Sequence, residues 1–188
     1  MTLTATDVKH IRGRGEGEGL ELIATRHNSD SSAAYEMIGM SEEVDTTVKL
    51  ALYRTIAATG AVPTSTEVAQ ATGMAENDVR GAFARLHAKR LLVPEPGDPS
   101  RIRMAPPFSG VPTAFPVEAQ GKRYYANCVW DAYGIAAALH ADAVIPACDG
   151  YSDEPLTLEV REDQPITQPY VAHFAVPAAH WWDDIIHT

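Results

Sequence analysis

The stretch KRYYANCVWD, residues 122–131, decides the expected fold, because a strand pattern changes to a helix pattern within it. A strand is expected over residues 117–125, which begin with Val117 and end with Tyr124 and Tyr125. Apolar residues at helical spacing then predict a helix at about residues 128–140. We expect an α+β protein whose C-terminal domain, residues 117–188, is mixed α/β. Further strands are expected at residues 143–147, 156–161 and 170–176.

The chain before this domain predicts a winged-helix-like module over residues 41–105. Helical periodicity indicates a first helix at about residues 42–59, followed by a short helix with Ser65 as its N-cap. A third helix is expected over residues 75–89, and a hairpin follows it around a Pro/Gly turn. Three helices followed by a hairpin are typical of a winged helix.

Two segments differ from these regions in composition. Residues 1–40 mix Gly, Ser, Thr and charged residues, and we expect them to form a flexible leader. The segment PPFSGVPTAFP, residues 106–116, is rich in proline, which cannot continue a helix or sit inside a central strand. It is therefore expected to be a linker between the two domains.

The overall composition indicates a soluble globular protein, with 45% hydrophobic and 21% charged residues among 188. Fifteen basic against 25 acidic residues give a net charge of −10, which argues against a nucleic-acid partner. The sequence lacks the apolar run of a membrane helix or secretion signal, so we expect a cytoplasmic location without a membrane partner. Two cysteines are too few for a disulfide scaffold.

One of the cysteines lies in the segment Asn127-Cys128-Val-Trp-Asp131. The three-residue spacing of Cys128 and Asp131 places a thiol and a carboxyl on one helix face. Free amide N–H groups at the helix start favour a thiolate, so we expect the pKa of Cys128 to be lowered. A catalytic pair is one interpretation. The other is that Cys128 packs as a small apolar residue and Asp131 is solvated.

Over residues 44–188 the sequence resembles the alkylmercury lyase family. In that family a winged-helix-like module precedes a strand that ends in an aromatic residue, and the next helix opens with Cys-x-x-Asp, as Cys128 and Asp131 do here. A non-catalytic cysteine after a short strand is similar to Cys148 in VIPACDG. The segment VAHFAVP, residues 171–177, resembles the strand that precedes the family's second active-site cysteine.

The resemblance implies protonolysis of a carbon–mercury bond. Cys128 would bind the mercury of the substrate as a thiolate, and Asp131 would protonate the leaving carbon. Burial against Trp130 or Tyr133 would raise the pKa of Asp131 for this task. Cys148 would be a structural thiol or an auxiliary one near the metal. No cofactor is implied, because the mercury belongs to the substrate.

The same resemblance implies which partners to expect and leaves the position of a second active-site cysteine open. The partners are a small organomercurial or other thiol-reactive substrate and low-molecular-weight thiols, and a homodimer is left open. The family's second active-site cysteine would follow the proline that matches Pro177, but the sequence ends at Thr188. We therefore expect an incomplete C-terminus or a divergent member of the family, and the activity of these residues alone stays open.

Two alternatives come from other parts of the chain. The module could belong to a transcriptional regulator or a thiol-sensing or metal-sensing protein, whose third helix enters the major groove of DNA. Its positive charge would come from Arg80, Arg85, Lys89, Arg90, Arg101 and Arg103. Near the C-terminus, helical spacing of His180, Asp183 or Asp184, and His187 is compatible with a divalent metal, or with a solvated face.

Overall fold

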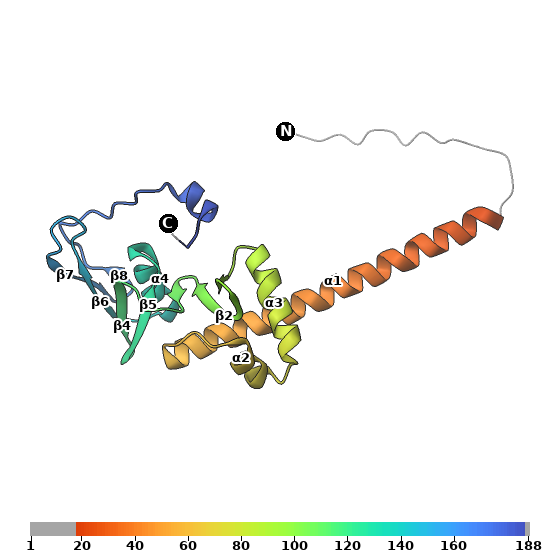
Figure 1. Ribbon diagram of the computed structural model, residues 1–188, viewed down its shortest axis with the longest axis horizontal. Helices are drawn as coiled ribbons and strands as arrows, with labels where there is room; N and C mark the ends of the chain where they lie inside the picture. The colour runs from red at the N-terminus through yellow and green to blue at the C-terminus, as the bar shows by residue number, and fades with distance from the viewer. Residues whose placement is uncertain (1–17, 187–188) are drawn as a thin grey trace. The chain divides into compact units, whose positions relative to one another are not determined.

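The computed structural model describes the backbone of residues 18–186 and the side chains of residues 36–186 (Figure 1). Contacts along the chain define two compact units, residues 1–42 and residues 43–188. The long helix α1 (Glu18–Thr59) belongs to both. None of the described helices combines the length and apolar character that crossing a membrane requires.

Helix α1 starts earlier than the sequence predicted. The expected start was near residue 42, where regular apolar periodicity begins, but the helix already includes residues 18–41, which contain good helix formers such as Leu, Glu, Ala and Met. This part of the expected leader is therefore helical, and the rest of the leader lies outside the described residues.

Helices α2 (Ser65–Thr72) and α3 (Glu76–Ala88) agree with the prediction to within a few residues. The N-cap of α2 is Thr64, however, and not Ser65. The Glu67 amide donates to Thr64 Oγ1 at 3.3 Å, and the Thr64 amide donates to Glu67 Oε2 at 2.7 Å, which forms a capping box. Ser65 is buried and its hydroxyl donates to Glu76 instead.

The predicted hairpin after α3 is confirmed as β1 (Val93–Glu95) and β2 (Asp98–Ala105), with Gly97 at a positive φ in the turn. These strands begin an antiparallel sheet with the order β1-β2-β3-β5-β4-β6-β7-β8. The short strand β3 (Phe108–Ser109) pairs with β2 and with β5.

Because β3 lies inside the segment expected to be a linker, the hairpin and the C-terminal strands share one sheet. β3 itself needs no proline N–H, because its two residues lie between prolines, whereas Pro116 of the same segment pairs with Tyr125. Residues 43–188 accordingly form one compact unit.

The single strand predicted over residues 117–125 is wrong. The structure has two strands here, β4 (Phe115–Ala119) and β5 (Lys122–Ala126), which pair with each other. Gln120 and Gly121 connect them with φ values of 52° and 70°, the positive values that a two-residue hairpin turn requires.

The strands β6 (Ala143–Cys148) and β7 (Pro155–Arg161) confirm their predictions, and the two-residue strand β8 (Gln164–Pro165) completes the sheet. The strand predicted over residues 170–176 is wrong, since these residues pair with no strand. Val171 is 91% exposed, and the neighbouring strand β8 pairs with Val160 and Arg161 at one end of β7. A short 3-10 helix, η1 (Ala178–Asp183), follows.

Helix α4 (Val129–Leu139) packs on β4 and β5, on one face of the sheet (Figure 1). The core extends without interruption from the helices to the strands. At its centre the Phe108 ring lies 6.2 Å from that of Tyr53 and 5.7 Å from that of Tyr124, and the Tyr124 hydroxyl donates to the Ala57 carbonyl at 3.0 Å. The predicted α+β class is thereby confirmed.

Candidate active site

The candidate site is the junction between β5 and α4. Ala126, the last residue of β5, is fully buried and pairs with both Phe108 and Phe115. Its carbonyl accepts a hydrogen bond of 2.5 Å from the Thr113 hydroxyl. Cys128 follows two residues later in extended conformation as the N-cap of α4. The sheet therefore determines where the thiol lies.

Asp131 lies in the first turn of α4, one turn after Cys128. The Asn127 side-chain amide donates to Asp131 Oδ2 at 2.9 Å. Burial raises the pKa of Asp131, and the hydrogen bonding from Asn127 offsets only part of that rise. The direction agrees with the sequence analysis, although Trp130 is 68% exposed and can contribute little to this burial.

Tyr53 of α1 lies near enough to Asp131 to feel its charge. Burial raises the pKa of Tyr53 to about 12, and the negative charge of nearby Asp131 contributes to the rise. The Tyr53 hydroxyl donates to the Pro106 carbonyl at 2.9 Å. The sequence analysis did not identify this residue, because nothing in a helical repeat indicates which distant carboxyl a tyrosine will approach.

The pKa of the Cys128 thiol is raised, which corrects the lowered value expected from its helix-start position. Cys128 is half-buried, and burial is the largest cause, with the negative charge of Asp131 acting in the same direction. The amide N–H groups of Asp131 and Trp130 lower the pKa, but by less. The helix-start N–H groups therefore do lower the pKa of Cys128 as predicted, but burial and the charge of Asp131 raise it by more.

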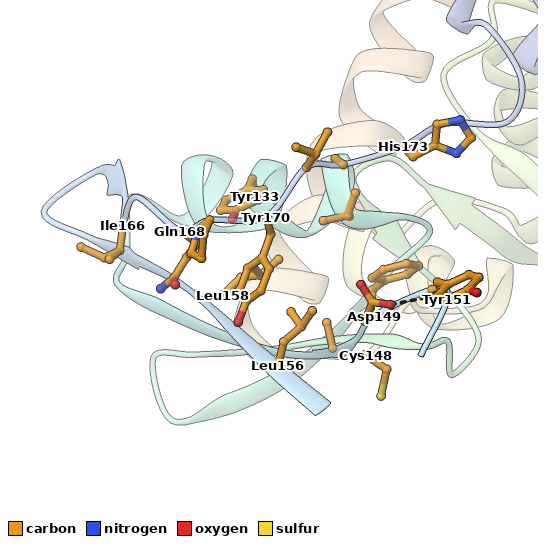
Figure 2. Close-up of a pocket in the computed structure, with 17 residues that line it drawn as sticks. Tyr133, Cys148, Asp149, Tyr151, Leu156, Leu158, Ile166, Gln168, Tyr170 and His173 are labelled. Atoms are coloured by element: carbon orange, nitrogen blue, oxygen red, sulfur yellow. Dashed lines mark hydrogen bonds between the residues drawn. The ribbon is translucent and has the colours of Figure 1, made fainter. Parts of the chain in front are cut away.

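Cys148 lies at the end of β6 and is exposed. It borders a cavity of about 840 Å³ that is also lined by Val129 and Tyr133 of α4 (Figure 2). Figure 2 shows its sulfur directed away from Tyr133 and Tyr170. Cys128 is not among the residues that line this cavity. A structural or auxiliary role of Cys148 stays a prediction.

The C-terminal metal hypothesis gains no support within residues 36–186. His180 Nδ1 lies 2.9 Å from Asp183 Oδ2, but no three His, Cys, Asp or Glu side chains gather to hold a metal in that part of the chain. His187 lies outside the described residues.

The basic residues of the helical module are largely paired with carboxylates. Arg80 contacts Glu76 at 2.6 Å, and Arg103 contacts Glu95 at 3.3 Å. Arg85 and Lys89 both bind the buried Asp45, at 2.8 Å and 3.2 Å. These pairs cancel much of the positive charge that DNA phosphates would need.

A family model matches the part of the chain that contains this site. Residues 108–188, which include β3 to η1, match the family model of alkylmercury lyase. The resemblance predicted from the sequence is therefore confirmed for this part of the chain. Residues 108–188 are therefore similar to the alkylmercury lyase family.

A solved structure entitled "Crystal structure of the mercury-bound form of MerB2" is similar as well. It is 22% identical, with a TM-score of 0.49 over 67% of this chain and 66% of the other, so the match spans slightly less than two thirds of that relative. A likeness of this size carries no argument about the site. The comparison with curated proteins found no match.

Proposed function

We propose that this protein is an organomercurial lyase that cleaves a carbon–mercury bond by protonolysis. One observation carries the proposal: in the domain that matches the alkylmercury lyase model, a half-buried thiol and a half-buried carboxyl share the first turn of α4. A soft thiolate binds mercury, and a carboxyl of raised pKa holds a proton more readily before donating it.

The proposed reaction starts with an organomercurial that carries a small thiolate ligand, R–Hg–SR′. The Cys128 thiol transfers its proton to the Asp131 carboxylate, and the resulting thiolate forms a bond to mercury. Asp131 then donates this proton to the carbon atom of R, the C–Hg bond breaks, and its electron pair forms the new C–H bond.

The products are the hydrocarbon RH and mercury held as Cys128–S–Hg–SR′. Mercury stays in the divalent state throughout, so no electron donor or acceptor is needed. The thiol proton accounts for the new C–H bond. A further small thiol would release the metal by exchange with Cys128. A low-molecular-weight thiol is therefore both a ligand of the substrate and the acceptor of the product.

Burial of the pair suits this reaction. The neutral thiol and the carboxylate together hold one proton, and the raised pKa values of Cys128 and Asp131 both favour keeping it inside the site. Transfer to Asp131 therefore creates the mercury ligand and the general acid in one step.

The test separates bond cleavage from metal binding. With phenylmercury and excess small thiol, Asp131→Asn should lower benzene formation by a factor of at least about 100 while Hg(II) still binds. Cys128→Ser should remove both functions, and the control Cys148→Ser should retain them. Cleavage by Asp131→Asn at the parent rate would show that Asp131 is not the proton donor.

A further inference from the structure

The carboxyl of Asp131 has one side-chain hydrogen bond among the described residues, and its donor is Asn127. Asn127 lies between the last paired residue of the sheet, Ala126, and the helix cap, Cys128. It is partly buried and immobilised on one side by strand pairing. The Asn127 side-chain amide thus lies between a residue that the sheet fixes, Ala126, and the residue that carries the thiol, Cys128.

From this geometry we infer that Asn127 is a positioning residue for the cleavage reaction, and that it holds the Asp131 carboxyl in the orientation from which it can reach the carbon bound to mercury. The inference rests on the proposed function. The 2.9 Å hydrogen bond engages Oδ2, and the Asn127 backbone amide also bonds to the carboxyl, so both restraints on its orientation come from this residue. Asn127 itself touches neither the substrate nor the transferred proton.

The alternative to this role is a structural one, in which Asn127 only joins β5 to α4. The two roles differ in what they affect. If Asn127 were only structural, its substitution would loosen the connection between β5 and α4, move Cys128 as well and weaken mercury binding. Loss of orientation at Asp131 alone would leave capture intact and slow the step that follows, since misplacing a reacting group by a fraction of an ångström is costly.

The experiment compares Asn127→Leu, which removes the amide donor at similar size, with the parent protein. Phenylmercury with excess small thiol is the substrate, and benzene release and Hg(II) binding are measured. We expect kcat to fall about 10- to 100-fold, with KM and Hg(II) binding within about twofold of the parent. Asn127→Gln keeps the amide and should recover part of the loss.

Gln120→Ala is the matched control. The Gln120 side chain donates to the Leu139 carbonyl at 3.2 Å, so it supports the other end of the same helix through one hydrogen bond. If Asn127 acts only by stabilising α4, Gln120→Ala should lower kcat to a similar extent. If Asn127 positions Asp131, Gln120→Ala should cleave at nearly the parent rate.

A double substitution tests the connection to Asp131 directly. In the Asp131→Asn background, Asn127→Leu should have no further effect on single-turnover cleavage, because the group that it orients is gone. Multiplicative losses would overturn the inference, as would a parent-like kcat in Asn127→Leu. Asn127→Ala serves the same comparison if the leucine variant folds poorly.

Failure of the proposed function gives a different result. If the parent protein, with small thiol present, does not release benzene from phenylmercury, the lyase proposal fails and the role of Asn127 fails with it. If the parent cleaves and the Asn127 variants cleave equally well, only the role of Asn127 is overturned.

Discussion

Asp131 illustrates how a single residue can be useful to a reaction and unfavourable for folding. Its carboxyl is buried enough that the charged form is disfavoured. The same burial that would suit it to the proposed role of general acid therefore opposes folding at a pH where the carboxyl must ionise. Replacing it by a neutral side chain should separate these two effects.

We predict that Asp131→Asn raises the melting temperature at pH 7 more than at pH 4. A carboxyl whose pKa is higher in the folded than in the unfolded protein destabilises folding as the pH rises above 3.8, and the penalty is complete above the raised value. Thermal unfolding of the parent and the variant at both pH values measures the difference.

Asp149 provides the opposite control. Hydrogen bonds from the amides of Ser152 and Tyr151, at 2.8 Å and 2.9 Å, lower the pKa of its exposed carboxyl. Its contribution to stability is present above pH 3.8 and lost as the pH falls further. Asp149→Asn should therefore lower the melting temperature at pH 7. An equal response of both variants to pH would contradict the role given to burial at Asp131.

The two cysteines also differ at this scale. The sequence places Cys128 at a helix start, from which a lowered pKa follows, but it does not reveal how deeply the residue is buried. The thiol is half-buried beside a carboxyl, and these effects dominate. Cys148, by contrast, is exposed at a strand end, as its position before a polar turn suggests.

At the scale of elements, the end of α1 is held close to the sheet. Gly60 follows the helix with a φ of 80°, and a Cβ atom there would lie 2.7 Å from the Arg123 carbonyl oxygen in β5. Two independent reasons therefore favour glycine at this position: the left-handed backbone and the close approach of a neighbouring strand.

We predict that Gly60→Ala lowers the free energy of unfolding by about 1–3 kcal/mol. Gly73→Ala is the matched control, because Gly73 has a φ of 72° after α2 but open space around its Cα. It should cost about 1 kcal/mol, from backbone strain alone. Urea unfolding of both variants measures the difference, and equal losses would show that the contact with β5 is unimportant.

Local patterns predicted most of the helices and the hairpin, since helical periodicity and turn residues act over a few positions. They failed where pairing partners decide the outcome. Residues 117–125 form two strands because the turn at Gln120 and Gly121 adopts positive φ, which Gln rarely does. Residues 170–176 have strand-like composition, but they pair with no strand of the sheet.

At the scale of the whole molecule, the candidate site draws on distant parts of the chain. The Cys128 and Asp131 pair could be predicted because its members are neighbours in one helix turn. Tyr53 could not, since it reaches Asp131 only when α1, β3 and β5 assemble around Phe108. Asn127 could be predicted only in part. The sequence shows that it stands one helical turn before Asp131, but the hydrogen bond between the two side chains appears only in the structure.

We predict that the full chain does not form a sequence-selective DNA complex at physiological salt. The net charge is −10, and Arg85 and Lys89 of the expected recognition helix region are paired with Asp45. An electrophoretic mobility shift assay at low and physiological salt tests this. A selective complex that survives physiological salt would favour the regulator over the lyase.

The two-residue strand β3 limits how the length of this protein can change. Phe108 pairs with Ala105 on one side and with Ala126 on the other. Ala126 lies only two positions before Cys128. One residue inserted before Phe108 would turn its ring to the opposite face of the sheet. Variation in chain length between β2 and β4 would therefore disturb the reacting thiol, whereas the exposed turn after Cys148 could lengthen freely.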